Sequence, residues 1–411
     1  MSTNNSSISY GRVVTLLLIG LVPAFSGALI NPTIPAIQNT FSHVPNSETL
    51  AQLVSSLSAW IVLVVAPLTG YLLDRYARKP ILLLGIITYG VGTSVAFFLD
   101  SIYLILLTRV LDGIAVGSLM VTVPTLIADY YTGSRRESIM GYFSAASSGG
   151  GVVAAMLGGY IASTLGWRYI FLVFAGALLF VPLIIRYISE PEVSQQTSED
   201  EVGRIEAAIN IVRENPAWLL ISIYLLVLIG MLTTNLIQIE VPFYLTGVLG
   251  VDGSTVGFTL SSVFAVAFVM ASLYGRIKQY LPHIAIMALS FSIAAAGFIV
   301  ITLVESFWPV YFGVLGSAVG FGVFLPTAND WVASVVDKRY RGRALSGVTM
   351  FMYGGFALSP FVPNPIIDQF GRVGMLRIAG LFLAVVAAVL YVLWLVNRSR
   401  SPRAEAPVAG D

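Results

Sequence analysis

The chain has 411 residues, with 22 basic against 21 acidic side chains and a mean hydropathy of +0.86. Only 10% of its residues are charged and 57% are hydrophobic, whereas a soluble domain carries about 25% charged residues. This composition excludes a soluble enzyme, a disordered protein and a nucleic-acid binder with a basic face, and it indicates a membrane protein. With no cysteine and two histidines, the sequence predicts no metal site and no bound cofactor.

Stretches of about 20 apolar residues, the length that crosses a bilayer as a helix, recur along the chain. Twelve are present, over residues 13–37, 50–73, 80–98, 102–127, 138–163, 168–188, 217–246, 255–275, 282–303, 307–335, 343–367 and 373–396. The sequence therefore predicts an all-α membrane protein with twelve transmembrane helices.

The basic residues indicate how these helices are oriented. With a cytoplasmic N-terminus, eighteen basic residues fall in cytoplasmic segments and three in external ones, the excess that membrane proteins show on the cytoplasmic side. We therefore expect a multi-pass protein of the plasma (inner) membrane with both termini cytoplasmic. The external loops are short and the sequence carries no sign of oligomerisation, so we expect a monomer without a nucleic-acid partner.

The longest loop, residues 189–216, lies at the centre of the chain. A capping-box pattern beginning at Ser198, followed by apolar residues at helical spacing, predicts a short amphipathic helix on the membrane surface. The loop divides the chain into two domains, which we place at 1–188 and 217–397, with a cytoplasmic tail over 398–411.

The two halves repeat each other at an offset of about 205 residues. The ordered series Pro124, Asp129, Arg135 and Gly141 in the first half corresponds to Pro326, Asp330, Arg341 and Gly347 in the second. Two six-span units in parallel repeat are typical of transporters whose bundles rock around a site at the membrane midplane. We therefore expect two pseudo-symmetric six-helix bundles.

The loop after the span 50–73 carries the most specific motif, Gly70-Tyr-Leu-Leu-Asp-Arg-Tyr-Ala-Arg-Lys79. It resembles the pattern Gly-x-Leu-x-Asp-Arg-x-Gly-Arg-Lys of the major facilitator superfamily, with Ala77 at the second glycine. The resemblance implies the major facilitator fold over about residues 10–397 and a latch for one conformation, in which Gly70 permits close helix approach. Alternatively, the charges only set the topology. The expected latch residues are Gly70, Asp74, Arg75, Arg78, Lys79, Asp129, Arg135, Asp330 and Arg341.

Two further motifs resemble the bacterial drug/proton antiporter branch of this family. The run Arg-Val-Leu-Asp-Gly at 109–113 is similar to Arg-x-x-Gln-Gly, and Gly-Gly at 158–159 is similar to the end of Gly-Pro-x-x-Gly-Gly, with Ala-Ala at 154–155. The resemblance implies a secondary transporter for proton-coupled efflux of amphipathic or cationic small molecules by alternating access. Because the second motif is incomplete, the alternative is a symporter or uniporter of an organic anion or other small metabolite bound through Arg109.

Three ionisable residues lie inside spans and away from their ends: Arg109, Asp112 and Glu240. Arg109 and Asp112 are three residues apart and share one helix face. Burial favours the protonated form of a carboxyl and a nearby Arg favours its charged form, so opening a cavity at this pair would move a proton. The alternative is a static, self-neutralised pair. Glu240 is expected to bind a proton or a cation, unless it simply stays hydrated near the external end of its helix.

Polar amides and mid-span aromatic rings predict the lining of a substrate cavity, since rings attract cations and amides donate and accept hydrogen bonds. The expected cavity residues are Asn31, Phe25, Asn235, Gln238, Tyr353 and Phe356. Their alternative roles are helix–helix ties and packing. The sequence has no Walker-type lysine, so the proton gradient is the expected energy source. The expected partners are a small-molecule substrate, protons and the lipid bilayer.

Overall fold

The computed structural model describes residues 2–191, 217–336 and 341–400, and every regular element in these ranges is a helix. Within them, eleven helical segments are long and apolar enough to cross a membrane, and a shorter apolar segment, Ala344–Leu358, supplies another helix. The predicted all-α class and twelve-helix architecture are confirmed. The short amphipathic helix expected in the central loop lies outside the described residues.

The first six spans comprise α1 (Ser2–Ile19), α2 (Val22–Ala28), η1 (Asn31–Thr33), α3 (Ile34–Thr40), α4 (Ser47–Arg75), α5 (Arg78–Ile87), η2 (Thr88–Gly92), η3 (Val95–Phe98), α6 (Ile102–Tyr130), α7 (Gly133–Thr164), η4 (Trp167–Tyr169), α8 (Ile170–Ala175), η5 (Gly176–Leu179) and α9 (Phe180–Tyr187). The last six comprise α11 (Ala217–Gly247), α12 (Gly253–Lys278), α13 (His283–Ile301), α14 (Phe307–Val335), α15 (Arg341–Leu358) and α16 (Asn364–Arg400).

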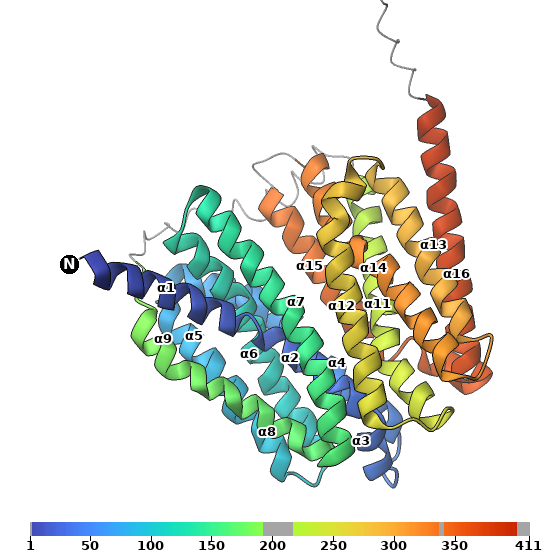
Figure 1. The fold of residues 1–411 in the computed structure, drawn as a ribbon, viewed down its shortest axis with the longest axis horizontal. Helices are drawn as coiled ribbons and strands as arrows, with labels where there is room; N and C mark the ends of the chain where they lie inside the picture. The colour runs from blue at the N-terminus through green and yellow to red at the C-terminus, as the bar shows by residue number, and fades with distance from the viewer. Residues whose placement is uncertain (1, 192–216, 337–340, 401–411) are drawn as a thin grey trace, which may run out of the picture.

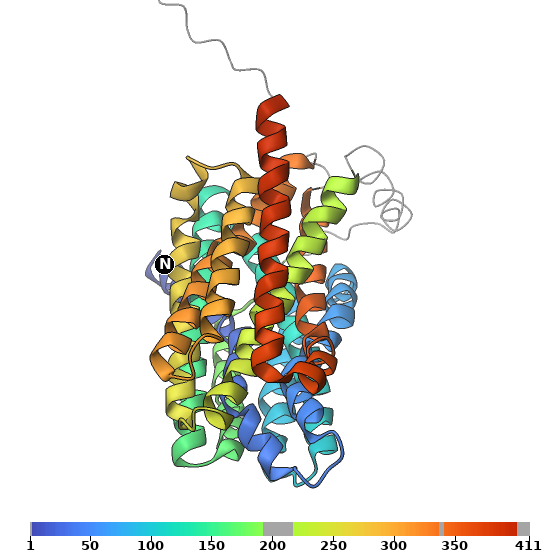
Figure 2. The ribbon, with the colours of Figure 1, turned by 90° about the vertical axis from the view of Figure 1, so that its right-hand side faces the viewer.

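The two halves form two helical bundles. Figure 1 shows the N-terminal bundle in blue to green beside the C-terminal bundle in yellow to red, with α7 and α12 adjacent between them. The bundles approach each other where α3 lies and diverge toward the opposite end, where α1 begins; we name these the α3 end and the α1 end. Figure 2 shows α16 running along the whole C-terminal bundle.

The first span is broken rather than continuous. Pro23, Pro32 and Pro35 stand in the first turns of α2, η1 and α3. Proline lacks an N–H and clashes with the preceding turn, so a helix begins at it more readily than it passes through it. The predicted helix over 13–37 is therefore divided into short segments.

The third and sixth spans also depart from regular α-helix. α5 continues into η2, which is a π-helical turn, and α8 continues into η5, which is a 3₁₀ turn. The two irregular turns pack against each other, and a Cβ on Gly90 would stand 2.7 Å from Leu178. A side chain at residue 90 would therefore force the Leu178 side chain to move.

The last two spans correct the predicted boundaries. The predicted span 343–367 extends too far, because α15 ends at Leu358 and α16 begins at Asn364. The intervening segment is apolar but contains Pro360 and Pro363, which stop helices without lowering hydropathy. α16 then kinks at Gly371, whose φ of 69° lies in the left-handed region that favours glycine.

The bundles touch through glycines where α7 crosses α12 at the α3 end. A Cβ on Gly159 would stand 2.4 Å from the carbonyl oxygen of Gly253 and 2.6 Å from the Cα of Gly257. Only residues without a side chain allow two backbones to come this close. Gly159 therefore serves packing between the bundles, while Gly158 serves packing within the N-terminal bundle, where its Cβ would stand 2.2 Å from the Leu29 carbonyl oxygen.

The N-terminus of α12 is capped by the side chain of Asp252. The Ser254 hydroxyl donates to one carboxylate oxygen of Asp252, and the Thr255 hydroxyl (2.5 Å) and backbone N–H (3.2 Å) donate to the other. These bonds, first of all that from Ser254, favour the carboxylate and hold the pKa of Asp252 below its ordinary value.

Candidate functional site

A cavity of about 200 Å³ lies between the two bundles. α2, η1, α4 and α6 line it from the N-terminal bundle, and α11, α12 and α15 line it from the C-terminal bundle. Five of the six expected cavity residues border it: Asn31, Asn235, Gln238, Tyr353 and Phe356. Phe25 does not; it borders a separate apolar cavity inside the N-terminal bundle.

The two walls of this central cavity differ in chemistry. The N-terminal wall carries hydroxyl groups, those of Ser26, Ser55, Ser56 and Ser58, whereas the C-terminal wall carries the rings of Phe264, Tyr353 and Phe356. None of the described lining side chains is charged. A molecule with one polar edge and one apolar or aromatic face would match both walls.

Amide side chains close the cavity toward the α3 end. Asn31 Nδ2 donates to Gln238 Oε1 at 3.0 Å, which joins the two bundles, and the Ser55 hydroxyl donates to Asn31 Oδ1. Asn235 Nδ2 donates to the Ser359 hydroxyl at 2.5 Å within the C-terminal bundle. A polar substrate group that enters here would compete with the Asn31–Gln238 bond.

The structure brings Arg109 and Asp112 together at the N-terminal wall, both with side chains 0% exposed. Asp112 Oδ2 accepts hydrogen bonds from Ser26 (2.5 Å) and Ser58 (2.6 Å), and Arg109 Nη1 lies 3.7 Å from the same oxygen. Ser26 lies on α2 and Ser58 on α4, so the carboxylate ties three helices together.

Aromatic rings hold the other half of this pair. The Arg109 guanidinium carbon lies 5.4 Å from the ring centre of Phe171 and 5.3 Å from that of Phe174. Among the described atoms, none of its three guanidinium nitrogens has a hydrogen-bond partner. The Asp112 carboxylate and the two rings are therefore the groups that stabilise this buried cation.

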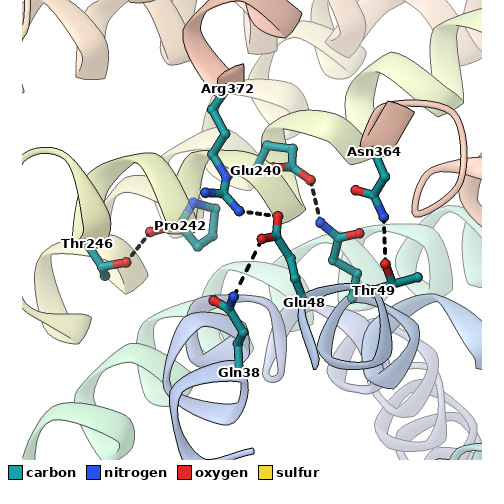
Figure 3. Close-up of polar contacts among 9 residues, drawn as sticks. Gln38, Glu48, Thr49, Glu240, Pro242, Thr246, Asn364 and Arg372 are labelled. Carbon is teal, nitrogen blue, oxygen red and sulfur yellow. Dashed lines mark hydrogen bonds and ion pairs between the residues drawn. The ribbon is translucent and has the colours of Figure 1, made fainter. Parts of the chain in front are cut away.

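Glu240 belongs to a second polar cluster, at the α3 end. Gln52 Nε2 donates to Glu240 Oε1 at 2.8 Å, and Arg372 Nε donates to Glu240 Oε2 at 3.2 Å. Arg372 also pairs with Glu48. Figure 3 shows Arg372 reaching from α16 toward both carboxylates. We call Glu48, Gln52, Glu240 and Arg372 the α3-end lock.

The lock joins the bundles, because Glu48 and Gln52 lie on α4 while Glu240 lies on α11 and Arg372 on α16. Beside it, Asn364 Nδ2 donates to the Thr49 hydroxyl at 3.0 Å, again across the bundles. The α3 end is thus closed by polar bonds.

Sequence reasoning found Glu240 but not its partners. Glu48 and Arg372 stand near helix ends and count as loop charges, and Gln52 is uncharged. A usable signal was present, since Glu48 and Gln52 are four residues apart and therefore share one face of the first turns of α4.

The expected latch residues of the N-terminal bundle lie at the α1 end. Arg78 Nε pairs with Asp129 Oδ2 at 2.7 Å, and the Glu190 carboxylate accepts the backbone N–H groups of Arg78 (2.6 Å) and Lys79 (2.9 Å). Arg75 lies over the Tyr71 ring. These described contacts join elements of one bundle, and Glu190 is a partner that the sequence did not reveal.

The remaining latch residues show one departure from the expectation and one difference between the halves. Gly70 makes no close approach in this conformation, because no described atom of another segment lies within 4 Å of the position its Cβ would take. Asp330, the counterpart of Asp129, accepts a bond from Tyr274 (2.7 Å) and lies 2.8 Å from His283 Nε2, where the first half has Arg78. The Arg135 guanidinium lies over the Tyr131 ring, and Arg341 begins α15. The Asp74 side chain lies outside the described parts.

Solved structures share this architecture. The structure aligns with a D-xylose-proton symporter at a TM-score of 0.78 and 16% identity, covering 93% of this chain and 97% of that one. It aligns with an inward-facing, unoccupied bacterial homologue of the human lysosomal transporter Spinster at a TM-score of 0.76 and 19% identity, covering 97% and 99%.

Sequence comparisons point the same way. Multidrug resistance protein 1 of Bacillus subtilis (strain 168) is 24% identical over 362 residues, which are 86% of this chain and 90% of that protein. Quinolone resistance protein NorB of Staphylococcus aureus (strain JH9) is 27% identical over 168 residues, 41% of this chain and 35% of that protein. The family model of the Major Facilitator Superfamily matches residues 16–277 and 223–410. The chain therefore belongs to the Major Facilitator Superfamily and is a multi-pass membrane transporter.

Proposed function

We propose that this transporter exports amphipathic or cationic small molecules in exchange for protons, by alternating access and as a monomer. The names of the similar drug-resistance proteins support export, and the two-walled central cavity suits amphipathic molecules. The uneven loop charges support a plasma (inner) membrane location with both termini cytoplasmic. In that orientation the α1 end faces the cytoplasm, and the closed α3 end makes this an inward-facing conformation.

One observation carries the proposal of proton coupling. Ser26 and Ser58 border the central cavity and also donate hydrogen bonds to Asp112. A bound cation and a proton therefore act on the same carboxylate, through hydroxyls that a substrate or water in the cavity can reach. Because two positive charges close to one carboxylate repel each other in a low-dielectric interior, binding of one favours release of the other.

The other two charged residues have supporting roles in this scheme. Arg109 is the cation beside Asp112, and it balances the carboxylate charge after the proton has left toward the cytoplasm. Glu240 is the second proton or cation group, and it lies in the α3-end lock, which must separate before the cavity opens to the outside.

The geometry favours this function over transport of an organic anion bound through Arg109. The Arg109 side chain is 0% exposed and lies between two phenylalanine rings. Among the described residues that border the central cavity, Arg109 is absent. An anion would have to displace Asp112 or the rings to reach it.

The test uses purified protein in liposomes that enclose a pH dye and hold a proton gradient. Tetraphenylphosphonium is added, and cation and proton movement are recorded for wild type, Asp112→Asn, Ser58→Ala and Ser56→Ala. We expect cation-triggered proton flux in wild type, its loss in Asp112→Asn and its reduction in Ser58→Ala. Ser56 borders the same cavity but bonds to the Gln52 carbonyl oxygen, so Ser56→Ala is the matched control and should retain the flux.

Two results would contradict the scheme. Proton flux that survives in Asp112→Asn would move the coupling role to Glu240. Cation movement without any proton movement in wild type would refute proton coupling and indicate a uniporter.

A further inference from the structure

A second cavity, of about 190 Å³, lies within the N-terminal bundle and is separate from the central one. Its lining is apolar and aromatic, and none of the described lining side chains is charged. We call it the side cavity; the lining residues used below are Val22, Phe25, Tyr89, Phe174, Gly176 and Ala177.

The side cavity stands where three irregular segments meet. The short helix α2, the π-helical turn η2 and the 3₁₀ turn η5 each contribute lining residues. Interiors built from regular helices are close-packed and leave few voids larger than a water molecule. A π-helical turn is rare, and such turns are frequent at functional sites. The side cavity, which is partly open rather than fully enclosed, therefore stands where the backbone departs from regular α-helix.

The chemistry of the lining predicts a dry site. The Tyr89 hydroxyl donates to the Val22 carbonyl oxygen at 3.0 Å, so it is already engaged. An ordered water requires two to four polar partners, which this apolar lining does not offer, so the side cavity favours an apolar occupant. The cavity, edged by the rings of Phe25, Tyr89 and Phe174, has the size and surface for one aromatic ring with a small substituent.

The side cavity also borders the buried charged pair from two directions. Phe174 lines it, packs edge-on against Tyr89 at 5.3 Å, and lies 5.3 Å from the Arg109 guanidinium. On α2, Phe25 lines the side cavity while the next residue, Ser26, donates to Asp112. A molecule in the side cavity would therefore press on both supports of the pair.

We propose that the side cavity binds one uncharged molecule of aromatic-ring size, and that its occupant alters proton movement at the Arg109–Asp112 pair. The binding rests only on the cavity itself. The effect on protons rests also on the proposed function, so the two parts are tested by separate measurements.

Binding is tested with crystals of the full-length protein pressurised with xenon, an apolar probe that reports its own position. We expect xenon density in the side cavity of wild type and none in Ala177→Leu, which fills it from η5. If Ala177→Leu does not fold, Gly176→Leu replaces it, because no described atom lies within 4 Å of its Cβ position. Leu179 is 73% exposed on the same turn and outside the lining, so Leu179→Phe is the matched control and should keep the density.

Wild-type crystals without xenon at this position, or with the elongated density of a lipid chain, would overturn the site. The effect on protons is tested in the liposome assay with fluorobenzene. At a concentration equal to its dissociation constant half of the sites are filled, so coupled proton flux should fall by up to about two-fold in wild type and not at all in Ala177→Leu. Equal inhibition of both proteins would overturn the link to Arg109. Xenon density in a wild-type protein that moves no protons would refute the proposed function and leave the site standing.

Discussion

Removal of the Arg372 side chain tests how the α3 end is held closed. Glu240 is 0% exposed, and in the closed state its charge is balanced by Arg372, whose side chain is 24% exposed. Deleting one partner of a buried ion pair costs about 3–5 kcal/mol when the other charge stays buried without compensation, so the measurement is made at alkaline pH, where Glu240 cannot avoid this cost by taking up a proton. Partial solvent screening at Arg372 lowers our figure for Arg372→Met to about 2–3 kcal/mol.

This cost falls on the closed state, because Glu240 gains water when the bundles separate at the α3 end. Since 1.4 kcal/mol is a factor of ten, the ratio of open to closed molecules should rise about 30- to 150-fold in Arg372→Met. Adding Glu240→Gln removes the uncompensated charge. The double variant should then lose only the partly exposed Glu48–Arg372 pair, about 1 kcal/mol or less, and open less than about five-fold.

The assay exploits the absence of cysteine from the sequence, which allows two labels without background. Spin labels on cysteines introduced at Ser42 and Val248, both exposed at the α3 end, report the distance between the bundles by double electron–electron resonance. Arg377→Met is the matched control: it removes the same charge from the same helix, but Arg377 bonds to the Thr302 carbonyl oxygen within its own bundle. A double variant as open as Arg372→Met, or a control that opens as far, would refute the reasoning.

Three further changes test separate features of the fold. Gly159→Ala places a Cβ 2.4 Å from a backbone oxygen of α12, so the same distance measurement should show a more open α3 end. The control Gly149→Ala meets no described atom within 4 Å and should leave that distance unchanged. Asp252→Asn keeps an N-cap of α12 but cannot titrate. Because folding lowers the pKa of Asp252, wild type should lose about 0.5 kcal/mol of stability as the pH falls below about 4, and Asp252→Asn should not. Melting temperatures that fall equally with pH in both proteins would contradict this. Glu190→Ala removes the acceptor of two N–H groups at the start of α5 and should lower the melting temperature by the equivalent of about 1 kcal/mol, while an unchanged temperature would show the cap to be idle.

The helices and their pairing into two bundles are readable from the sequence, because a bilayer demands apolar segments of fixed length and a repeat demands a common architecture. Hydropathy fails where apolar residues do not continue a helix. It extends the span that begins at 343 through Pro360 and Pro363, and it reads the first span as continuous although Pro23 and Pro32 divide it.

The candidate site is only half readable. Arg109 and Asp112 are visible because a charge inside a span is costly and therefore rare. Ser26 and Ser58 are not visible, since serines are frequent in helices and their significance depends on which helices face each other. Arg372 has the same difficulty: the kink at the preceding glycine turns an apparent loop charge toward Glu240.

Helix α2 is the partition between the two cavities. Val22 and Phe25 border the side cavity, while Ser26 and Gly27 border the central one. A helix of seven residues bounded by breaks can shift as one short unit, and the two cavities are the space on either side of it. A displacement of α2 toward one chamber takes space from that chamber and gives space to the other, so the contents of each chamber influence the capacity of its neighbour.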